Sequence, residues 1–260
     1  MVHAVPDILA RIVEHKRSEL SHSIASRGLL ERRAAERTDF RDFRAALTVQ
    51  TPAVIAEIKK ASPSRGILCE DFKPASIALT YAQGGAAVLS VLTDRKFFEG
   101  CLDDLEAARA AVSIPVLRKD FTLDEFHVIE AAAHGADAIL LIAALLEETE
   151  LRRLRELAAH YRIAALVEVH DEEELARALA SGAEIVGVNN RNLHTFDVTL
   201  ETSLRLAKKI PANVIKVSES GFHSRADVRK LQSAGYQAFL IGEHLMRSAD
   251  PAAALKALRS

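Results

Sequence analysis

The sequence predicts a (β/α)8 TIM barrel with an N-terminal helical extension, and three observations support this fold class. From residue 53 onward, short apolar segments rich in Val, Ile, Leu and Ala recur, as expected of parallel strands buried on both faces. A helical pattern follows each segment, and glycine ends four of the helices, at Gly84–Gly85, Gly135, Gly182 and Gly235, where it fits a left-handed C-cap. Eight such units match a closed barrel. The alternative, an open doubly wound sheet, usually carries a Gly-rich first turn, which this sequence lacks.

The extension is expected to cover residues 1–48 and to pack on the barrel, within a single domain over residues 1–260. Its first helix is expected to begin at Pro6–Asp7. An apolar stripe along this helix consists of Ile8, Ile12, Val13 and Leu20. A second helix is expected over Asp39–Leu47, with Thr38 or Asp39 as its N-cap.

The barrel elements are read from the alternation of strand and helix patterns. The expected strands are Ala53–Ile58, Ala87–Leu92, Pro115–Leu117, Ala138–Ile142, Ala164–Val169, Ile185–Val188, Val214–Val217 and Ala238–Ile241. The expected helices are Pro74–Gln83, Leu102–Ala111, Asp124–His134, Glu147–His160, Asp171–Ala180, Leu200–Lys208, Ser224–Ser233 and Pro251–Leu258.

Composition excludes several classes of function. The 34 basic and 36 acidic residues leave a net charge of −2, which gives no argument for binding nucleic acid or an anionic membrane. No apolar leader precedes residue 20 and no apolar run is long enough to span a bilayer, so a cytoplasmic protein without a membrane partner is expected. The two cysteines, Cys69 and Cys101, are expected to be free thiols. No spacing of ligands suggests a metal.

The first strand ends in two opposite charges. Side chains alternate along a strand, so Glu57 and Lys59 share a face with Ile55. Burying a charge is costly unless it is paired or used. The segment is therefore typical of a strand that carries an acid and a base to the rim of an active site; an ion pair of purely structural value is the alternative.

Polar residues follow almost every expected strand at its carboxyl end, which is where barrels place catalytic groups. Lys119, Glu168 and Asn189 occupy the same parity on their strands as Glu57 and Lys59 occupy on the first. If this parity faces inward, lysines and glutamates meet at the barrel mouth. Such a set can act as general acids and bases.

The last two strands end in glycine. Ser220–Gly221 and Gly242–Glu243 could each turn backbone N–H groups toward a phosphate at a helix start; tight turns alone are the other interpretation. Lys216 lies in mid-strand, where an outward side chain packed on a helix is favoured over a Schiff-base lysine.

These segments resemble the indole-3-glycerol phosphate synthase family. The motifs that carry the resemblance are Ala56–Gly66, Leu92–Asp94 with Lys96–Phe98, Val116–Phe121, Val167–His170, Gly187–Leu193 and Val217–Gly221. They occur in order along the whole chain; the second asparagine, Asn190, is a mild departure, since smaller residues also occur there in the family. The resemblance implies a lyase that needs no cofactor or metal. It converts 1-(2-carboxyphenylamino)-1-deoxyribulose 5-phosphate to indole-3-glycerol phosphate with loss of carbon dioxide and water, in tryptophan biosynthesis.

The resemblance also implies residue roles. Lys119 is the general acid at the carbonyl, and Glu168 is the acid–base residue of the dehydration. Lys59 contacts the substrate carboxylate or phosphate and is a candidate second acid. Further catalytic candidates are Glu57, Asn189 and Ser220. The substrate-binding candidates are Ser62, Pro63, Phe98, Phe121, Leu140, Ile142, Arg191, Leu193 and Glu219, and the phosphate candidates are Lys59, Gly221, Gly242 and Glu243.

Two alternatives stay open at this point. A sister barrel, phosphoribosylanthranilate isomerase, needs a cysteine–aspartate pair at strand ends, whereas Cys69 and Cys101 fall in a loop and near a helix start. A catalytically silent phosphate-binding barrel would have lost its acids and bases, which this chain keeps. The expected partner is a phosphorylated small molecule, and the expected state is a monomer or weak homo-oligomer.

Overall fold

The computed structural model describes residues 7–63, 65–193 and 195–259, and within them eight parallel strands close into a barrel. Each strand pairs with the next along the chain, and the first pairs with the last. The strands are β1 (Ala53–Ile58), β4 (Val88–Leu92), β5 (Val116–Lys119), β6 (Ala138–Ile142), β7 (Ala164–Val169), β8 (Ile185–Asn189), β9 (Ile215–Glu219) and β10 (Ala238–Ile241). The predicted (β/α)8 fold is confirmed.

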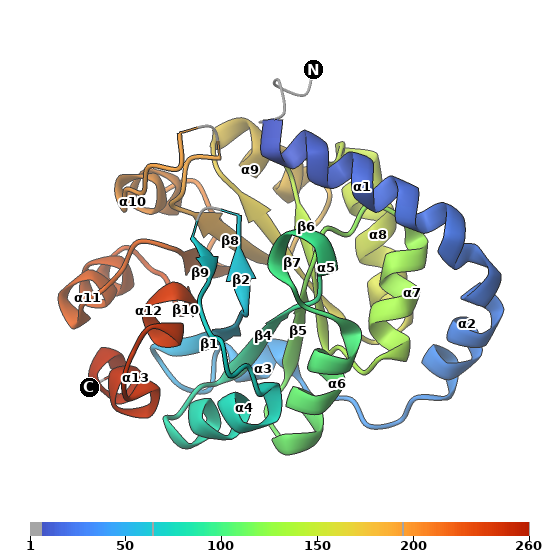
Figure 1. The fold of residues 1–260 in the computed structure, drawn as a ribbon. Helices are drawn as coiled ribbons and strands as arrows, with labels where there is room; N and C mark the ends of the chain where they lie inside the picture. Colours follow the sequence, from blue (N-terminus) through green and yellow to red (C-terminus); the bar gives the residue numbers. More distant parts are fainter. Residues whose placement is uncertain (1–6, 64, 194, 260) are drawn as a thin grey trace.

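Helices surround the barrel (Figure 1). They are α4 (Pro74–Gln83), α6 (Leu102–Ala111), α7 (Glu125–Ala133), α8 (Glu148–His160), α9 (Glu172–Ala180), α10 (Glu201–Ala207), α11 (Arg225–Ser233) and α13 (Pro251–Arg259). Each lies within a residue or two of its predicted bounds. Gly135, Gly182 and Gly235 have φ between 85° and 95°, as predicted for C-cap glycines.

Short elements in the loops were not predicted. Two four-residue helices, α5 (Arg95–Phe98) and α12 (Glu243–Met246), follow β4 and β10, and a small antiparallel pair, β2 (Ala61–Ser62) with β3 (Gly66–Ile67), follows β1. None is long enough to show a hydrophobic period. All of them lie at the carboxyl ends of the barrel strands.

The N-terminal extension is helical, but not where the second helix was expected. It consists of α1 (Asp7–Ser23), the 3-10 turn η1 (Ile24–Ser26), α2 (Arg27–Glu36) and α3 (Phe43–Ala46). The helix predicted over Asp39–Leu47 is therefore only four residues long. Its N-cap is Asp42, whose carboxylate accepts a hydrogen bond from Ala45 N at 2.8 Å, and not Thr38 or Asp39. Pro6 lies outside the described residues.

Helix α1 crosses the barrel on the side of the carboxyl ends, and α2 continues down its outer wall beside α7 (Figure 1). A buried ion pair holds α1 in this position. Lys16 Nζ lies 2.9 Å from Asp120 and 3.4 Å from Asp94, in the loops that follow β5 and β4. The extension thus contacts the end of the barrel where catalytic residues were predicted.

The core has two layers. Inside the barrel, side chains of one parity pack together, among them Ile55, Leu117, Leu140, Leu166, Val217 and Leu240. Side chains of the opposite parity, such as Val54, Leu89 and Ile139, pack between strands and helices. The inward parity is therefore the one that continues to Glu57, Lys119 and Glu168, as the sequence pattern suggested.

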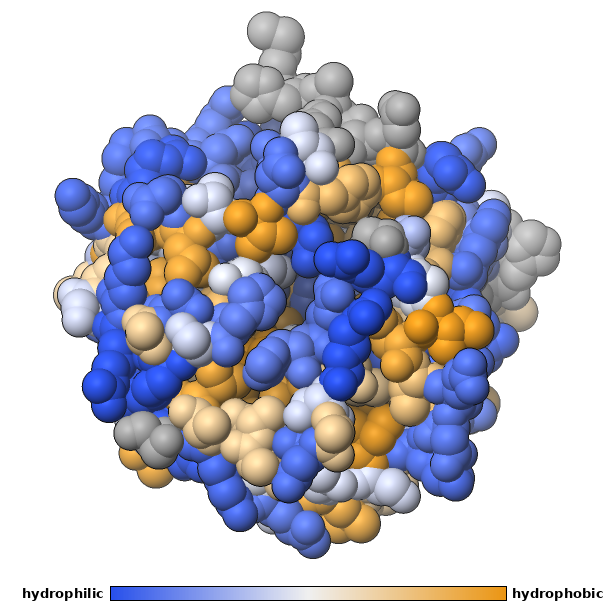
Figure 2. Space-filling model, turned by 60° about the vertical axis from the view of Figure 1, so that its left-hand side comes forward, coloured by the Kyte–Doolittle hydropathy of each residue, from blue (hydrophilic) through white to orange (hydrophobic). Residues whose placement is uncertain are grey.

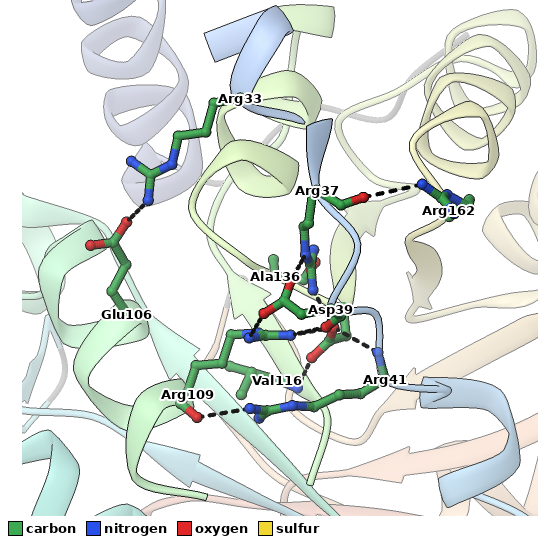
Figure 3. A network of polar contacts seen from close by, with 10 residues as sticks. Arg33, Arg37, Asp39, Arg41, Glu106, Arg109, Val116, Ala136 and Arg162 are labelled. Atoms are coloured by element: carbon green, nitrogen blue, oxygen red, sulfur yellow. Dashed lines mark hydrogen bonds and ion pairs between the residues drawn. The ribbon is translucent and has the colours of Figure 1, made fainter. Parts of the chain in front are cut away.

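Opposite the site, a buried charge network binds the segment between α2 and α3 to the amino ends of the strands (Figure 3). Asp137 is fully buried and accepts hydrogen bonds from Arg37 Nη2 at 2.5 Å, Arg41 N at 3.2 Å and Val116 N at 3.0 Å. Arg109 pairs with Asp39 at 2.5 Å and approaches Asp137 at 3.4 Å. The network explains why this segment is extended and not helical.

Replacing Asp137 with alanine is expected to destabilise the protein by about 3–5 kcal/mol, because two arginines lose a buried counter-charge. Urea unfolding measures the change. The matched control is Glu184→Ala, which removes an exposed ion pair with Arg44 at the same end of the barrel. That variant should lose less than about 1 kcal/mol. Equal stabilities for both variants would contradict the role given to Asp137.

Candidate active site

A cavity of about 780 Å³ opens at the carboxyl ends of the strands. Every site residue named from the sequence lines it: Glu57, Lys59, Ser62, Pro63, Phe98, Lys119, Phe121, Leu140, Ile142, Glu168, Asn189, Arg191, Leu193, Glu219, Ser220, Gly221, Gly242 and Glu243. The molecular surface in Figure 2 is hollowed near its centre, with hydrophilic side chains at the edge of the hollow and apolar ones beyond them. Residues far apart in the sequence therefore face one pocket.

The charged floor of the cavity follows from strand parity. Each charged or amide side chain stands two residues after an interior position: Glu57 after Ile55, Lys119 after Leu117, Glu168 after Leu166, Asn189 after Gly187, and Glu219 after Val217. The strands hold these groups on rigid backbone. That is what positioned acid–base groups require.

Lys119 lies at the centre of this floor. Its Nζ lies 3.2 Å from Glu168 Oε2 and 3.7 Å from Glu219 Oε2. Burial disfavours the ammonium, but the charges of Glu168, Glu219 and Glu57 outweigh it and raise the pKa of Lys119. Lys119 is therefore charged at neutral pH and has a proton to give.

The two nearest glutamates differ in charge. Burial works against ionised Glu168, yet Lys119 and His170 keep its pKa well below the ordinary value. Asn189 Nδ2 also donates to Glu168 Oε1 at 3.1 Å. Burial, and then the charge of Glu168, raise the pKa of Glu219 to about 8. At neutral pH one carboxylate is available as a base, and its neighbour keeps a proton.

Two glycines make room for the carboxylates. A Cβ at Gly187 would lie 2.1 Å from Glu219 Oε1, and a Cβ at Gly242 would lie 2.1 Å from Glu57 Oε1. Glu57 in turn pairs with Lys59 Nζ at 2.5 Å. Gly242 was named as a phosphate ligand. The structure adds that its bare Cα faces the Glu57–Lys59 pair.

Gly242→Ala is expected to lower kcat/KM roughly 10- to 100-fold, because the methyl group displaces the Glu57 carboxylate from its pair with Lys59; misplacing a group by about 1 Å can cost this much. Steady-state kinetics measure the loss. The control is Gly28→Ala in α2, where a Cβ would meet nothing within 4 Å. Unchanged kinetics in Gly242→Ala would show that the site tolerates movement of Glu57.

Near the last two strands the cavity carries basic groups that the sequence reading missed. Glu243 pairs with Arg65 Nε at 3.1 Å and Arg247 Nε at 3.4 Å. His223 and His244 line the same part of the cavity. In the sequence, His223 follows Gly221, and His244 and Arg247 follow Gly242, so basic residues after these glycine turns could have indicated this part of the site. The loop Ser62–Gly66 carries Arg65 into this cluster; Ser64 itself lies outside the described residues.

The opposite wall is apolar. The Phe98 and Phe121 rings lie 6.1 Å apart, next to Leu140 and Ile142 of β6. Helix α1 adds Ile8, Leu9 and Ile12. The sequence placed Ile8 and Ile12 on an apolar stripe, but none of the three in the site. The cavity therefore has an apolar wall, a charged floor and a basic end.

Two earlier alternatives can now be placed in the fold. Among the described residues that line the cavity there is no cysteine, and Cys101 is the N-cap of α6. Lys216 points outward, as favoured, and its Nζ donates a hydrogen bond to the Ala207 carbonyl at 2.9 Å. Neither observation favours isomerase or Schiff-base chemistry.

A family model described as indole-3-glycerol phosphate synthase matches residues 9–258. The chain belongs to this family. The indole-3-glycerol phosphate synthase of Albidiferax ferrireducens is 52% identical over 258 residues, covering 97% of this chain and 98% of its own. That of Chromobacterium violaceum is 53% identical and covers 97% of each chain.

Solved structures agree on the fold. A 3-hexulose-6-phosphate synthase superimposes with a TM-score of 0.64 at 21% identity, over 80% of this chain and 98% of its own. Thiamine phosphate pyrophosphorylase from Pyrococcus furiosus gives 0.61 at 16% identity, over 80% and 94%. At these identities the likeness is one of architecture. None of the helices among the described residues is long and apolar enough to cross a membrane.

Proposed function

We propose that this member of the indole-3-glycerol phosphate synthase family is a carboxy-lyase that closes the indole ring in tryptophan biosynthesis. Its substrate is 1-(2-carboxyphenylamino)-1-deoxyribulose 5-phosphate, and its products are indole-3-glycerol phosphate, carbon dioxide and water. The observation that carries the proposal is the Lys119–Glu168 contact of 3.2 Å in a cavity with an apolar wall and a basic end.

The charges support an order of steps. Lys119, held as an ammonium, protonates the carbonyl oxygen while the ring carbon attacks the carbonyl carbon. Carbon dioxide then leaves and the ring regains aromaticity. The hydroxyl departs as water as the ionised Glu168 takes a proton from the adjacent CH2; Lys59 is the second acid for this departure.

The remaining residues bind and orient the substrate. Glu57 and Asn189 position Lys59 and Glu168, with which they are in contact. The aromatic ring packs against the apolar wall, with Ser62 and Pro63 beside it. Arg191, Leu193, Glu219 and Ser220 surround the reacting chain, and Gly221, Gly242, Glu243 and Lys59 meet the phosphate, joined by Arg65 and Arg247 from the basic end.

An indole fluorescence assay tests the function. Adding the carboxyphenylamino sugar phosphate to the purified chain should produce indole fluorescence with one carbon dioxide released per indole. Binding of indole-3-glycerol phosphate without turnover would instead support the silent phosphate-binding barrel. If neither the carboxyphenylamino sugar phosphate nor indole-3-glycerol phosphate binds, both the synthase function and the silent phosphate-binding barrel are wrong.

We also propose that one chain suffices for activity, because all residues of the proposed site lie in one chain. This agrees with a monomer or weak homo-oligomer, and activity that is proportional to protein concentration would test it. The free Cys69 and Cys101 suit the reducing cytoplasm, where we place the enzyme.

A further inference from the structure

The proposed reaction consumes one proton in each turnover. The carbonyl oxygen gains one proton as the ring closes and a second as it departs as water. The CH2 group returns one proton, and the ionised carboxylate leaves as carbon dioxide without taking or giving any. The proton that Glu168 takes from the CH2 group balances the one that Lys59 gives to the departing hydroxyl. The proton that Lys119 gives at ring closure must therefore be replaced from water before the next cycle, although its partner Glu168 is only 3% exposed.

A second group contacts Glu168 from the side away from the cavity. His170 Nε2 lies 3.3 Å from Glu168 Oε1, and His170 Nδ1 lies 2.9 Å from Glu174 Oε2. The side chains of His170 and Glu174 remain 12% and 11% exposed. Neither residue is among the described residues that line the cavity. The contacts thus form a chain from Glu168 to the outer surface at the start of α9.

We propose that His170 and Glu174 form a proton relay that returns a proton from water to Glu168 and Lys119 while substrate or product occupies the cavity. This inference rests on the proposed function. His170 is a positioning and relay residue, since it touches Glu168 and not the substrate cavity.

The charges of His170, Glu168 and Lys119 agree with proton transfer from His170 toward Glu168 and Lys119. The groups facing the imidazole are Glu168 and Glu174. Burial opposes its charge, but the ion-pair contact with Glu168, the hydrogen bond with Glu174 and the two negative charges raise the pKa of His170 to about 10. At rest Lys119 is the main charge that keeps the pKa of Glu168 low. Once Lys119 has given its proton, that charge is gone and Glu168 becomes more basic. The proton then passes from His170 Nε2 to Glu168 and on to the Lys119 amine, and water reprotonates the imidazole.

A purely structural role for these residues must be distinguished. Glu174 also accepts a hydrogen bond from His170 N at 2.8 Å, beside the Asp171 N-cap of α9. Glutamine at position 174 keeps an oxygen for this backbone contact but cannot hold the negative charge. Glu174→Gln therefore separates the cap from the relay.

The experiment compares His170→Ala and Glu174→Gln with the intact enzyme and with the control Glu173→Gln, an exposed carboxylate of the same turn paired with Arg177. His170→Ala should lower kcat about 100-fold, the lower end of the cost of a lost proton-transfer group, with KM within about two-fold. Added imidazole should restore at least a tenth of the lost rate. Glu174→Gln should lower kcat about 10-fold and raise the solvent deuterium isotope effect, and Glu173→Gln should change neither.

Imidazole nitrogen NMR provides a readout that does not depend on turnover. His170 should stay doubly protonated up to about pH 9 in the intact protein and titrate at lower pH in Glu174→Gln. A neutral His170 at pH 7, or a rate loss in His170→Ala that imidazole does not restore, would overturn the relay while leaving the proposed function intact. An intact enzyme that makes no indole would overturn the function itself, and the relay with it.

Discussion

Lys119→Ala is expected to lower kcat by about 1,000-fold or more, while indole-3-glycerol phosphate still binds. The ammonium is the only cation in contact with Glu168 and Glu219 from within the described cavity lining, so its loss removes both the acid and the partner of two carboxylates. General acids commonly contribute about 100- to 10,000-fold to rate. Indole fluorescence measures turnover, and calorimetry measures product affinity.

The control for this variant is Lys216→Ala. Lys216 also lies on a barrel strand, but its Nζ donates to the Ala207 carbonyl outside the barrel. We expect its removal to affect stability and to leave kcat within about two-fold, since surface and helix-facing contacts do not touch the reacting atoms. Undiminished turnover in Lys119→Ala would show that Lys119 is not the general acid, and Lys59 would then be the candidate for that role.

Strand parity explains why so much of this site could be read from the sequence. A strand buried on both faces consists almost entirely of apolar residues, so a charged residue such as Glu57 or Glu168 at its carboxyl end stands out in the sequence. Parity then fixes the side on which the charge lies. The same regularity placed the ends of β1, β6, β7 and β10 without error.

Local rules failed where long-range contacts decide. The segment before α3 is extended because Asp137, about a hundred positions further along the chain, binds Arg37 and the Arg41 backbone. Helix propensity describes only local preferences, so it cannot predict a contact between residues this far apart in the sequence. The pairing of Glu243 with Arg65 joins the first strand's loop to the last, and likewise cannot be read from spacing.

The steric role of Gly187 and Gly242 was invisible for a related reason. The sequence shows only that these strands contain glycine, which suggests a turn or close backbone approach. The groups that need the space are Glu219 and Glu57, which come from neighbouring strands. Only the closed barrel brings these carboxylates against the bare Cα atoms.

Glu168→Gln is expected to lower kcat about 100- to 1,000-fold with KM almost unchanged, because an amide cannot take the proton that the dehydration releases. The amide has the same shape as the carboxylate, and its single oxygen can still accept a hydrogen bond from either Asn189 or Lys119, which donate to the two separate oxygens of Glu168. The neighbouring carboxyl makes the test sharper. Glu219 keeps its proton partly because of the charge on Glu168, so removing that charge lowers the pKa of Glu219 and lets it ionise beside Lys119.

Lys119 therefore retains a negative partner and its own proton in Glu168→Gln, and ring closure should proceed while dehydration stalls. Rapid-quench analysis should then find the decarboxylated hydroxy-indoline accumulating before indole appears. Asn192→Asp, the reverse exchange of an amide for a carboxylate on the loop after β8, serves as the control and should leave kcat within about three-fold. A large loss of affinity with normal turnover would reassign Glu168 to binding the ground state, since a base acts only on the reacting proton.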